Sequence, residues 1–201
     1  MLARVSASHG EHPICAFAGG ALPTTILSCC ARALLPLLST RAVLPLRATC
    51  MEAAAAIAAH PWEDSETLIR GRVRDWRACF PRARAANVAD TYLFCAPRQA
   101  PGDADFVHLA GLRALNMRGS NGVTDAAFAH LHGIHTLDMS SCDLKGITDA
   151  AFANLAGIHT LDMGGCKQPG ITRATFEHLR GIHKLHLHGG GHWLTHARPR
   201  E

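Results

Sequence analysis

The sequence predicts an α/β solenoid, a short arc of parallel strands with helices on its convex side, preceded by a small all-α segment. The main observation is a 24-residue repeat, because TDAAFAHLHGIHTLDMSSC at 124–142 returns as TDAAFANLAGIHTLDMGGC at 148–166. A repeat of this length is one supersecondary unit whose apolar face is buried by the next copy. In each copy the apolar and polar residues alternate at the end, which is the pattern of a strand. A Leu-, Ala- and Pro-rich stretch at 22–62 predicts short helices upstream.

Composition limits the class of protein before any motif is considered. The chain of 201 residues can form one large domain or two small ones, and 48% of it is hydrophobic, as is ordinary for a globular protein. The formal charge of +4 is mild and the arginines are spread, so no nucleic-acid partner is expected. No apolar run reaches the ~20 residues that span a bilayer, so no membrane partner is expected either. The eight cysteines form no CxxC pair and no secretion signal is evident, which indicates reduced thiols and a cytoplasmic or nuclear location.

The chain before the repeats is expected to hold a leader and two helices. Residues 1–20 show no periodicity and are expected to be a disordered leader, with a targeting segment as the alternative. In the helical segment at 21–63, a first apolar helix is expected over about 24–35. A second is expected over 45–59, with Pro45 suited to its first turn and an alanine run of high helix propensity. Such short apolar helices are stable only when they pack on each other or on a partner.

A linking helix is expected over 64–79, between these helices and the repeats. Asp64 or Ser65 can cap it, because a side-chain oxygen there accepts a hydrogen bond from the first helical turn. Its apolar residues recur at the spacing of one helix face: Leu68, Ile69, Val73, Trp76 and Phe80. The arginines that lie off this face indicate a solvated surface.

The repeats are expected to fill residues 80–196, followed by a frayed tail at 197–201. Four clear units are marked by phenylalanines 22, 24 and 24 residues apart: Phe106, Phe128, Phe152 and Phe176. A degenerate opening unit is expected just before them, in an alignment that places Asn87 over Asn116. No dedicated cap follows the last unit in the sequence, so its fraying is expected.

Alternation along each strand separates inward from outward side chains. The inward positions are expected to be Leu112, Leu115, Met117, Ile134, Leu137, Met139, Ile158, Leu161, Met163, Ile182, Leu185 and Leu187. Thr124, Thr148 and Thr172 stand where helix N-caps are needed. Cys142 and Cys166 are expected to be small buried residues where the strands end.

The repeat phrase resembles the cysteine-containing class of leucine-rich repeats, LxxLxLxxC followed by ITD. It stands here as Ile134, Leu137, Met139 and Cys142, then Ile147-Thr148-Asp149. That class commonly follows an F-box, and the upstream stretch resembles one. The matching elements are Leu22-Pro23 at the opening, Ile26 and Leu27 in the first helix, Leu35-Pro36-Leu37 in the middle turn, Leu46-Arg47 with Cys50, and Pro61-Trp62 at the close. Thr25 and Ala54 depart from the pattern, where an acidic residue and a Trp are usual.

The resemblance implies a non-catalytic substrate-recognition (adaptor) subunit of a cullin–RING ubiquitin ligase. The F-box-like helices would bind the adaptor of the ligase through Leu22, Pro23, Ile26, Leu27, Leu35, Leu38, Leu46 and Cys50. A target protein would bind the concave face of the repeats at Asn116, Arg118, Asp138, Ser140, Asp162, Lys184, His186 and His188. The alternative is a stand-alone leucine-rich-repeat protein-binding module whose N-terminal helices merely cap the solenoid.

Neither an enzyme nor a cofactor is predicted. The sequence has no Walker loop, GxGxxG after a strand, HExxH, GxSxG or zinc-ribbon spacing. Asp138 and Asp162 would be stacked carboxylates on neighbouring strands, but no nucleophile or cleft is expected beside them. A zinc site is a third alternative, although no metal ligand is assigned, because histidines crowd the C-terminus: His183, His186, His188, His192 and His196.

Overall fold

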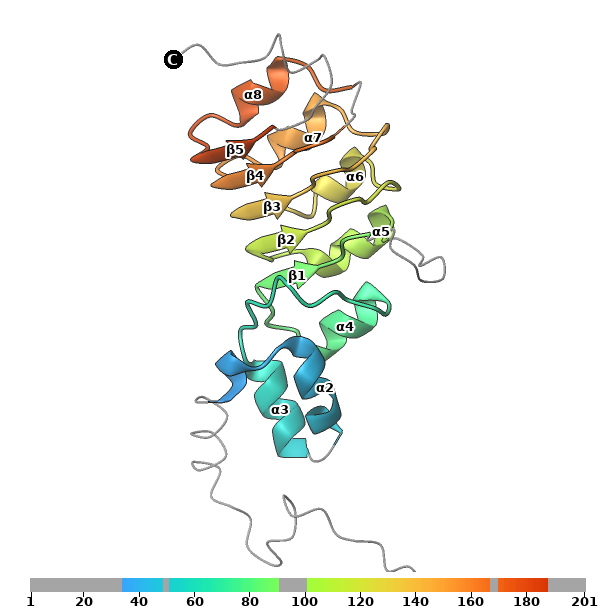
Figure 1. The fold of residues 1–201 in the computed structure, drawn as a ribbon, viewed down its shortest axis with the longest axis vertical. Coiled ribbons are helices and arrows are strands. Elements are labelled where there is room, and N and C mark those ends of the chain that lie inside the picture. The colour runs from blue at the N-terminus through green and yellow to red at the C-terminus, as the bar shows by residue number, and fades with distance from the viewer. Residues whose placement is uncertain (1–33, 49–50, 91–100, 167–169, 188–201) are drawn as a thin grey trace, which may run out of the picture.

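The computed structural model describes residues 34–48, 51–90, 101–166 and 170–187. The expected leader, most of the first expected helix and the expected tail lie outside these residues. Figure 1 shows an elongated molecule with helices α2 and α3 towards one end and the strands stacked one above another towards the other end.

Five parallel strands form one open sheet in sequence order. They are β1 (Ala85–Asn87), β2 (Ala114–Asn116), β3 (Thr136–Asp138), β4 (Thr160–Asp162) and β5 (Lys184–His186). Equivalent repeat positions pair across the sheet, so Asn87 lies beside Asn116 and Asp138 lies beside Asp162. The expected α/β class with parallel strands is therefore confirmed, and so is the alignment of the degenerate opening unit.

A short helix precedes each of the last four strands, and these helices lie together behind the sheet (Figure 1). They are α5 (Asp103–Phe106) with the 3-10 helix η2 (Val107–Leu109), α6 (Asp125–Phe128), α7 (Asp149–Ala153) and α8 (Ala174–His178). Thr124 and Thr148 cap α6 and α7, because their hydroxyl oxygens accept hydrogen bonds from the amides of Ala126 and Ala150. Helices this short depend on packing for their stability.

The core between helices and strands is continuous through the central units. Phe106, Phe128 and Phe152 are fully buried, and the rings of Phe128 and Phe152 lie 6.1 Å apart. The expected inward positions of β2, β3 and β4 are buried as well. In the last unit, by contrast, the inward positions and the phenylalanine are only half-buried: Phe176, Ile182, Leu185 and Leu187.

A hydrogen-bonded ladder of Asp and Thr side chains joins each repeat to the next. The carboxylate of Asp125 accepts the backbone N–H and the hydroxyl of Thr148 at 2.8 and 2.6 Å. Asp103 accepts the same two bonds from Thr124, and Asp149 accepts them from Thr172. The repeated Thr-Asp pair therefore both begins a helix and fixes the distance between neighbouring units.

The helix expected over 45–59 is two helices, α2 (Thr40–Arg47) and α3 (Met51–Ala59). Pro45 lies near the end of α2 and not in the first turn of a helix. The oxygen of Ser39 accepts a hydrogen bond from the amide of Ala42 and so begins α2 earlier than the proline would suggest. Upstream of α2, the 3-10 helix η1 (Leu35–Leu37) contains a proline in its first turn.

The linking helix is also shorter than expected, since α4 covers only Val73–Cys79. Asp64 accepts hydrogen bonds from the amides of Glu66 and Thr67, which forms a local turn in place of a helix cap. The chain then runs alongside β1, where Leu68 forms a parallel bridge with Asn87. The segment expected to be helical therefore forms an isolated parallel bridge with β1 before α4 begins.

The N-terminal helices share a core with the repeats. Val43, Ile57 and Trp62 belong to the same buried cluster as Val73 and Phe80. The indole N–H of Trp62 donates to the carbonyl of Ile57 at 2.8 Å, and its ring meets Phe80 edge-on at 5.6 Å. This packing closes the N-terminal end of the repeat array.

Candidate protein-binding surfaces

Only part of the expected adaptor-binding set falls within the described residues. Leu35, Leu38 and Leu46 do, whereas Leu22, Pro23, Ile26, Leu27 and Cys50 lie outside them. Leu38 and Leu46 are 36% and 37% exposed, so part of each side chain can meet a partner. Leu35 is 8% exposed and packs in the core, so little of its side chain lies at the surface, and its role in adaptor binding stays a prediction.

Other apolar side chains at this end are more exposed than the expected ones. Leu37 is 80% exposed, and the remaining members are Leu34, Leu44 and Met51. The sequence places Leu37 in the middle turn of the F-box-like stretch, outside the expected adaptor-binding set. Its position within a 3-10 helix of Leu-Pro-Leu, which turns only one side inward, is what leaves it exposed.

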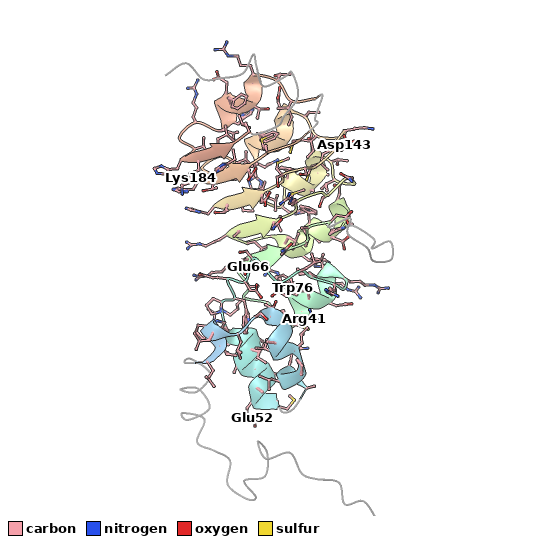
Figure 2. All side chains as sticks on the ribbon, in the orientation of Figure 1. Arg41, Glu52, Glu66, Trp76, Asp143 and Lys184 are labelled. Carbon is pink, nitrogen blue, oxygen red and sulfur yellow. The ribbon has the colours of Figure 1, made fainter. Side chains whose placement is uncertain are left out.

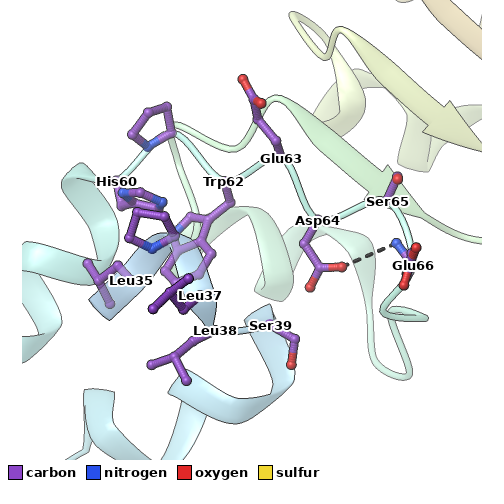
Figure 3. Close-up of a pocket in the computed structure, with 12 residues that line it drawn as sticks. Leu35, Leu37, Leu38, Ser39, His60, Trp62, Glu63, Asp64, Ser65 and Glu66 are labelled. Carbon is purple, nitrogen blue, oxygen red and sulfur yellow. Dashed lines mark hydrogen bonds between the residues drawn. The ribbon is translucent and has the colours of Figure 1, made fainter. Parts of the chain in front are cut away.

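A cavity of about 490 Å³ is lined by Leu35, Leu37 and Leu38 among other residues (Figure 3). One wall is formed by residues 35–39 and the other by residues 60–66. Burial would raise the pKa of Asp64, but hydrogen bonds donated by the backbone and side chains of Thr40 and Thr67 outweigh it and lower that pKa. The cavity therefore has leucines on one wall and an ionised carboxylate on the other.

A second cavity of about 370 Å³ lies between α2 and the segment that leads through α4. Its apolar lining comes from Leu44 of α2 and from Leu68, Ile69, Trp76 and Phe80. The alternative of a simple cap predicts that Leu22, Ile26, Leu38 and Leu46 are buried against residues 68–88. Leu22 and Ile26 lie outside the described residues, and Leu38 and Leu46 are 36% and 37% exposed, so neither of these two is fully covered.

The strand face places the expected target-binding residues in rows that cross the sheet. Asn116, Asp138, Asp162 and His186 occupy equivalent positions on β2 to β5, as their pairing shows. Arg118 is exposed beyond the end of β2, and Lys184 is exposed on β5, where Figure 2 shows it at the margin of the sheet. His188 lies outside the described residues.

Several of these polar groups bind their own chain. Asp138 accepts hydrogen bonds from the amide and the hydroxyl of Ser140 at 2.9 and 2.6 Å, and Asp162 accepts one from the amide of Gly164 at 2.8 Å. Asn116 accepts one from the amide of Arg118 in the same way. These side chains therefore shape the turns that follow the strands, and the hydroxyl of Ser140 is already engaged.

A further row, which sequence reasoning did not assign as a site, precedes the strands. It consists of Arg84, Arg113, His135, His159 and His183, and we call it the cationic row. The ring centroids of the three histidines lie 4.5 and 4.6 Å apart, with interplanar angles of 11° and 22°. Partial desolvation, together with the neighbouring His135, His183 and Lys184, lowers the pKa of His159. The signal in the sequence is the recurrence of a histidine at one position of the last three units, with an arginine at that position in the two units before them.

Cys142 and Cys166 are buried, as expected. Their thiols donate to the carbonyl oxygens of Met117 and Met139 at 3.3 and 2.9 Å. Burial raises the pKa of Cys142 to about 12, so this thiol stays protonated at neutral pH. Both cysteines act as structural groups within the core.

The described part of the chain contains no cluster of three or more His, Cys, Asp or Glu side chains that could hold a metal ion. Among the same residues, none of the helices has the length and apolar character needed to cross a membrane.

Comparison with known proteins identifies no family for this chain. No family model matches the chain, and no curated protein matches its sequence. Among solved structures, one similar chain belongs to the Toll–Spatzle complex of Drosophila, with a TM-score of 0.35 and 11% sequence identity. The likeness covers 69% of this chain and 28% of that chain.

Proposed function

We propose that this chain is a leucine-rich-repeat substrate receptor of a cullin–RING ubiquitin ligase, with an F-box-like N-terminal segment. The observation that carries the proposal is the order of motifs, LP…LRxxC…PW upstream of in-register LxxLxLxxC-ITD units. The exposed leucines of η1 and α2 support it, because exposed apolar side chains gathered at one end of a molecule are typical of an interaction site.

In this proposal the two binding sites have separate tasks. The helical end (η1, α2 and α3) holds the adaptor, and the strand face holds the target protein. The ubiquitin-charged enzyme of the ligase is thereby brought close to the target, so the receptor accelerates transfer by proximity and supplies no reacting group. The helical end and the stacked strands lie towards opposite ends of the elongated molecule (Figure 1), so the adaptor and the target would be held apart.

Co-purification with the purified adaptor subunit tests the proposal. The variants Leu37→Asp and Leu46→Asp are expected to weaken adaptor binding, because each places a charge among the apolar side chains that the adaptor would cover. Val107→Asp is the matched control, since Val107 is 49% exposed but lies on η2, within the repeat array. Wild-type chain that does not bind the adaptor at about 1–10 μM would contradict the proposal.

The second candidate is a stand-alone leucine-rich-repeat binding module. One observation favours it: Val43, Ile57 and Trp62 are buried in the core of the first repeat, as a cap would be. Such a module would keep its target binding while lacking any affinity for the adaptor. The co-purification experiment therefore separates the two candidates.

A further inference from the structure

The cationic row is held in place by the backbone of the sheet. The amide of Arg113 donates to the carbonyl of Arg84, and the same bond links His135 to Arg113, His159 to His135 and His183 to His159, at 2.6–3.0 Å. Four of the five side chains are exposed, and His159 is half-buried between its two neighbours. The row is therefore a rigid line of basic groups along one margin of the strand face.

The three imidazole rings are also fixed in orientation. The Nδ1 atoms of His135 and His159 lie 3.3 and 3.1 Å from the hydroxyl oxygens of Thr136 and Thr160, the residues that follow them. The rings stack face to face at 4.5 and 4.6 Å. Protonation of neighbouring rings at this spacing brings like charges together, so each proton added to the stack opposes the next.

The cationic row has an acidic side chain beside its first residue, a basic one beside its last residue, and two carboxylates along its length. Glu63 lies 3.7 Å from Arg84 in an exposed ion pair, and Lys184 adds a positive charge next to His183. Asp138 and Asp162 lie two residues further along β3 and β4 from Thr136 and Thr160, and so form a parallel acidic row. A partner that lies across the strands meets a basic line beside an acidic pair.

We propose that the cationic row is the docking strip for an acidic peptide segment of the target, and that docking draws protons onto the stacked histidines. Carboxylates of the segment lie against the arginines and histidines, while a basic residue of the same segment reaches Asp138 and Asp162. This deepens the target-binding half of the proposed function and rests on it. Charge complementarity is what selects this partner.

A peptide fits this surface better than a nucleic acid does. A nucleic acid presents an unbroken line of phosphates, and the carboxylates of Asp138 and Asp162 beside the row would repel them. A peptide can alternate the sign of its charge and can match both rows at once. The mixed charge of the surface therefore favours a mixed-charge peptide with an acidic excess.

Docking is consequently linked to protons. In the free chain, partial desolvation and the neighbouring cations lower the pKa of His159. Carboxylates of the bound peptide raise the histidine pKa values relative to the free chain, so binding gains strength below the free pKa and loses it as the pH rises through the bound pKa. Imidazoles titrate between about pH 5 and 8, so the affinity should change across that range.

The test uses the full chain and a fluorescein-labelled peptide made of Glu-Glu-Lys repeats, with binding followed by fluorescence anisotropy at constant ionic strength. The peptide is expected to bind roughly tenfold more tightly at about pH 5.5 than at about pH 7.5. A triple variant, with His135→Gln, His159→Gln and His183→Gln, should bind the peptide at pH 7.5 as the wild type does. It should not bind the peptide more tightly at pH 5.5 than at pH 7.5. Glutamine keeps a polar side chain but cannot take up the proton.

Two further variants complete the design. Arg84→Gln with Arg113→Gln should weaken binding at both pH values, because the guanidinium charge does not titrate there. His130→Gln with His132→Gln is the matched control, since these histidines lie in the turn between α6 and β3 and are not members of the row, so the tighter binding at low pH should remain. Circular dichroism and thermal unfolding confirm that each variant is folded, and His135→Gln alone replaces the triple variant if that one does not fold.

Several results would overturn the inference. These are a wild-type chain that does not bind the peptide at pH 5.5, a pH gain that survives in the histidine variant, or a single-stranded oligonucleotide that displaces the peptide at lower concentration than unlabelled peptide does. Adaptor co-purification is measured on the same preparations. Loss of peptide binding with adaptor binding retained refutes this inference alone, and the reverse result refutes the adaptor half of the proposed function.

Discussion

The two ends of the repeat array differ in how well their apolar residues are covered. At the N-terminal end, Trp62 and Phe80 are 1% and 0% exposed, because α2, α3 and the segment before β1 pack over the first unit. In the last described unit, Leu185 and Phe176 occupy the same repeat positions as fully buried residues of the central units, yet they are only half-buried. The difference teaches that burial at a repeat position depends on the neighbouring unit as much as on the residue itself.

The largest expected effect contrasts a central phenylalanine with the terminal one. Phe152→Ala should lower the free energy of unfolding by about 3–5 kcal/mol, because it leaves a cavity in a fully enclosed core. Phe176→Ala should cost less than about 2 kcal/mol, since its side chain is already partly in water. Urea unfolding of the two variants measures both values. Equal costs would mean that the two ends of the array are equally enclosed in solution.

The closure of the N-terminal end can be probed at Trp62. Trp62→Phe removes the N–H that donates to the carbonyl of Ile57 and leaves a small gap beside Phe80. We expect a loss of about 1–2 kcal/mol in unfolding free energy, seen as a lower midpoint in urea. Trp76→Phe, at a partly buried ring on the same core, is the control and should cost less. A neutral Trp62→Phe would show that the helical end does not close the array.

The Asp–Thr ladder should contribute a smaller amount. Thr148→Val removes the hydroxyl that caps α7 and donates to Asp125, so we expect a loss of about 1 kcal/mol in unfolding free energy. Thr148→Ser keeps the hydroxyl and should stay within about 0.5 kcal/mol of the wild type. Thermal unfolding measures both variants. If the two variants lose the same stability, the side chain acts through its methyl group and not through the ladder.

The smallest expected effect is a change in the stability of the fold at acid pH, caused by protonation of Asp149. Burial would raise the pKa of Asp149, but hydrogen bonds from Thr172 and Thr175 outweigh it and lower that pKa. The resulting stability is fully present above the unfolded pKa of about 3.9 and is lost as the pH falls through the lowered folded pKa. Asp149→Asn should therefore flatten the acid limb of the stability profile, which urea unfolding across the acid pH range measures. An unaltered profile in Asp149→Asn would contradict this assignment.

The repeat half of the fold could be predicted because each copy has the same order of apolar and polar residues. Alignment alone placed Asn87 over Asn116, since parallel strands of a repeat keep a fixed register. The helical half could not be predicted in detail, because its helix ends depend on contacts far apart in the sequence. Asp64, for example, accepts hydrogen bonds from the amide and hydroxyl of Thr40, 24 residues away, and so is held against the start of α2.

The candidate surfaces were predicted less well for a related reason. Alternation along a strand identified the outward residues Asp138 and Asp162, but not the contacts that their carboxylates make with their own turns. The sequence shows the stacked histidines only as a residue that recurs at one repeat position. Their face-to-face contact forms between neighbouring repeat units and cannot be read from a single unit. Exposure of Leu37 likewise follows from the geometry of η1 and not from its residue type.

The Asp–Thr ladder has a consequence for how such a chain can lengthen. A central unit carries a Thr that meets the unit before it and an Asp that meets the unit after it, as Thr148 and Asp149 do. A duplicated copy of 148–171 inserted at its own boundary would therefore find both partners in place, so gene duplication could extend the array from within. The last unit has Arg173 where the others have Asp, so an added copy would find no acceptor there. A copy inserted within the array would thus keep both hydrogen-bonded partners, whereas a copy added after the last described unit would lack the Asp acceptor.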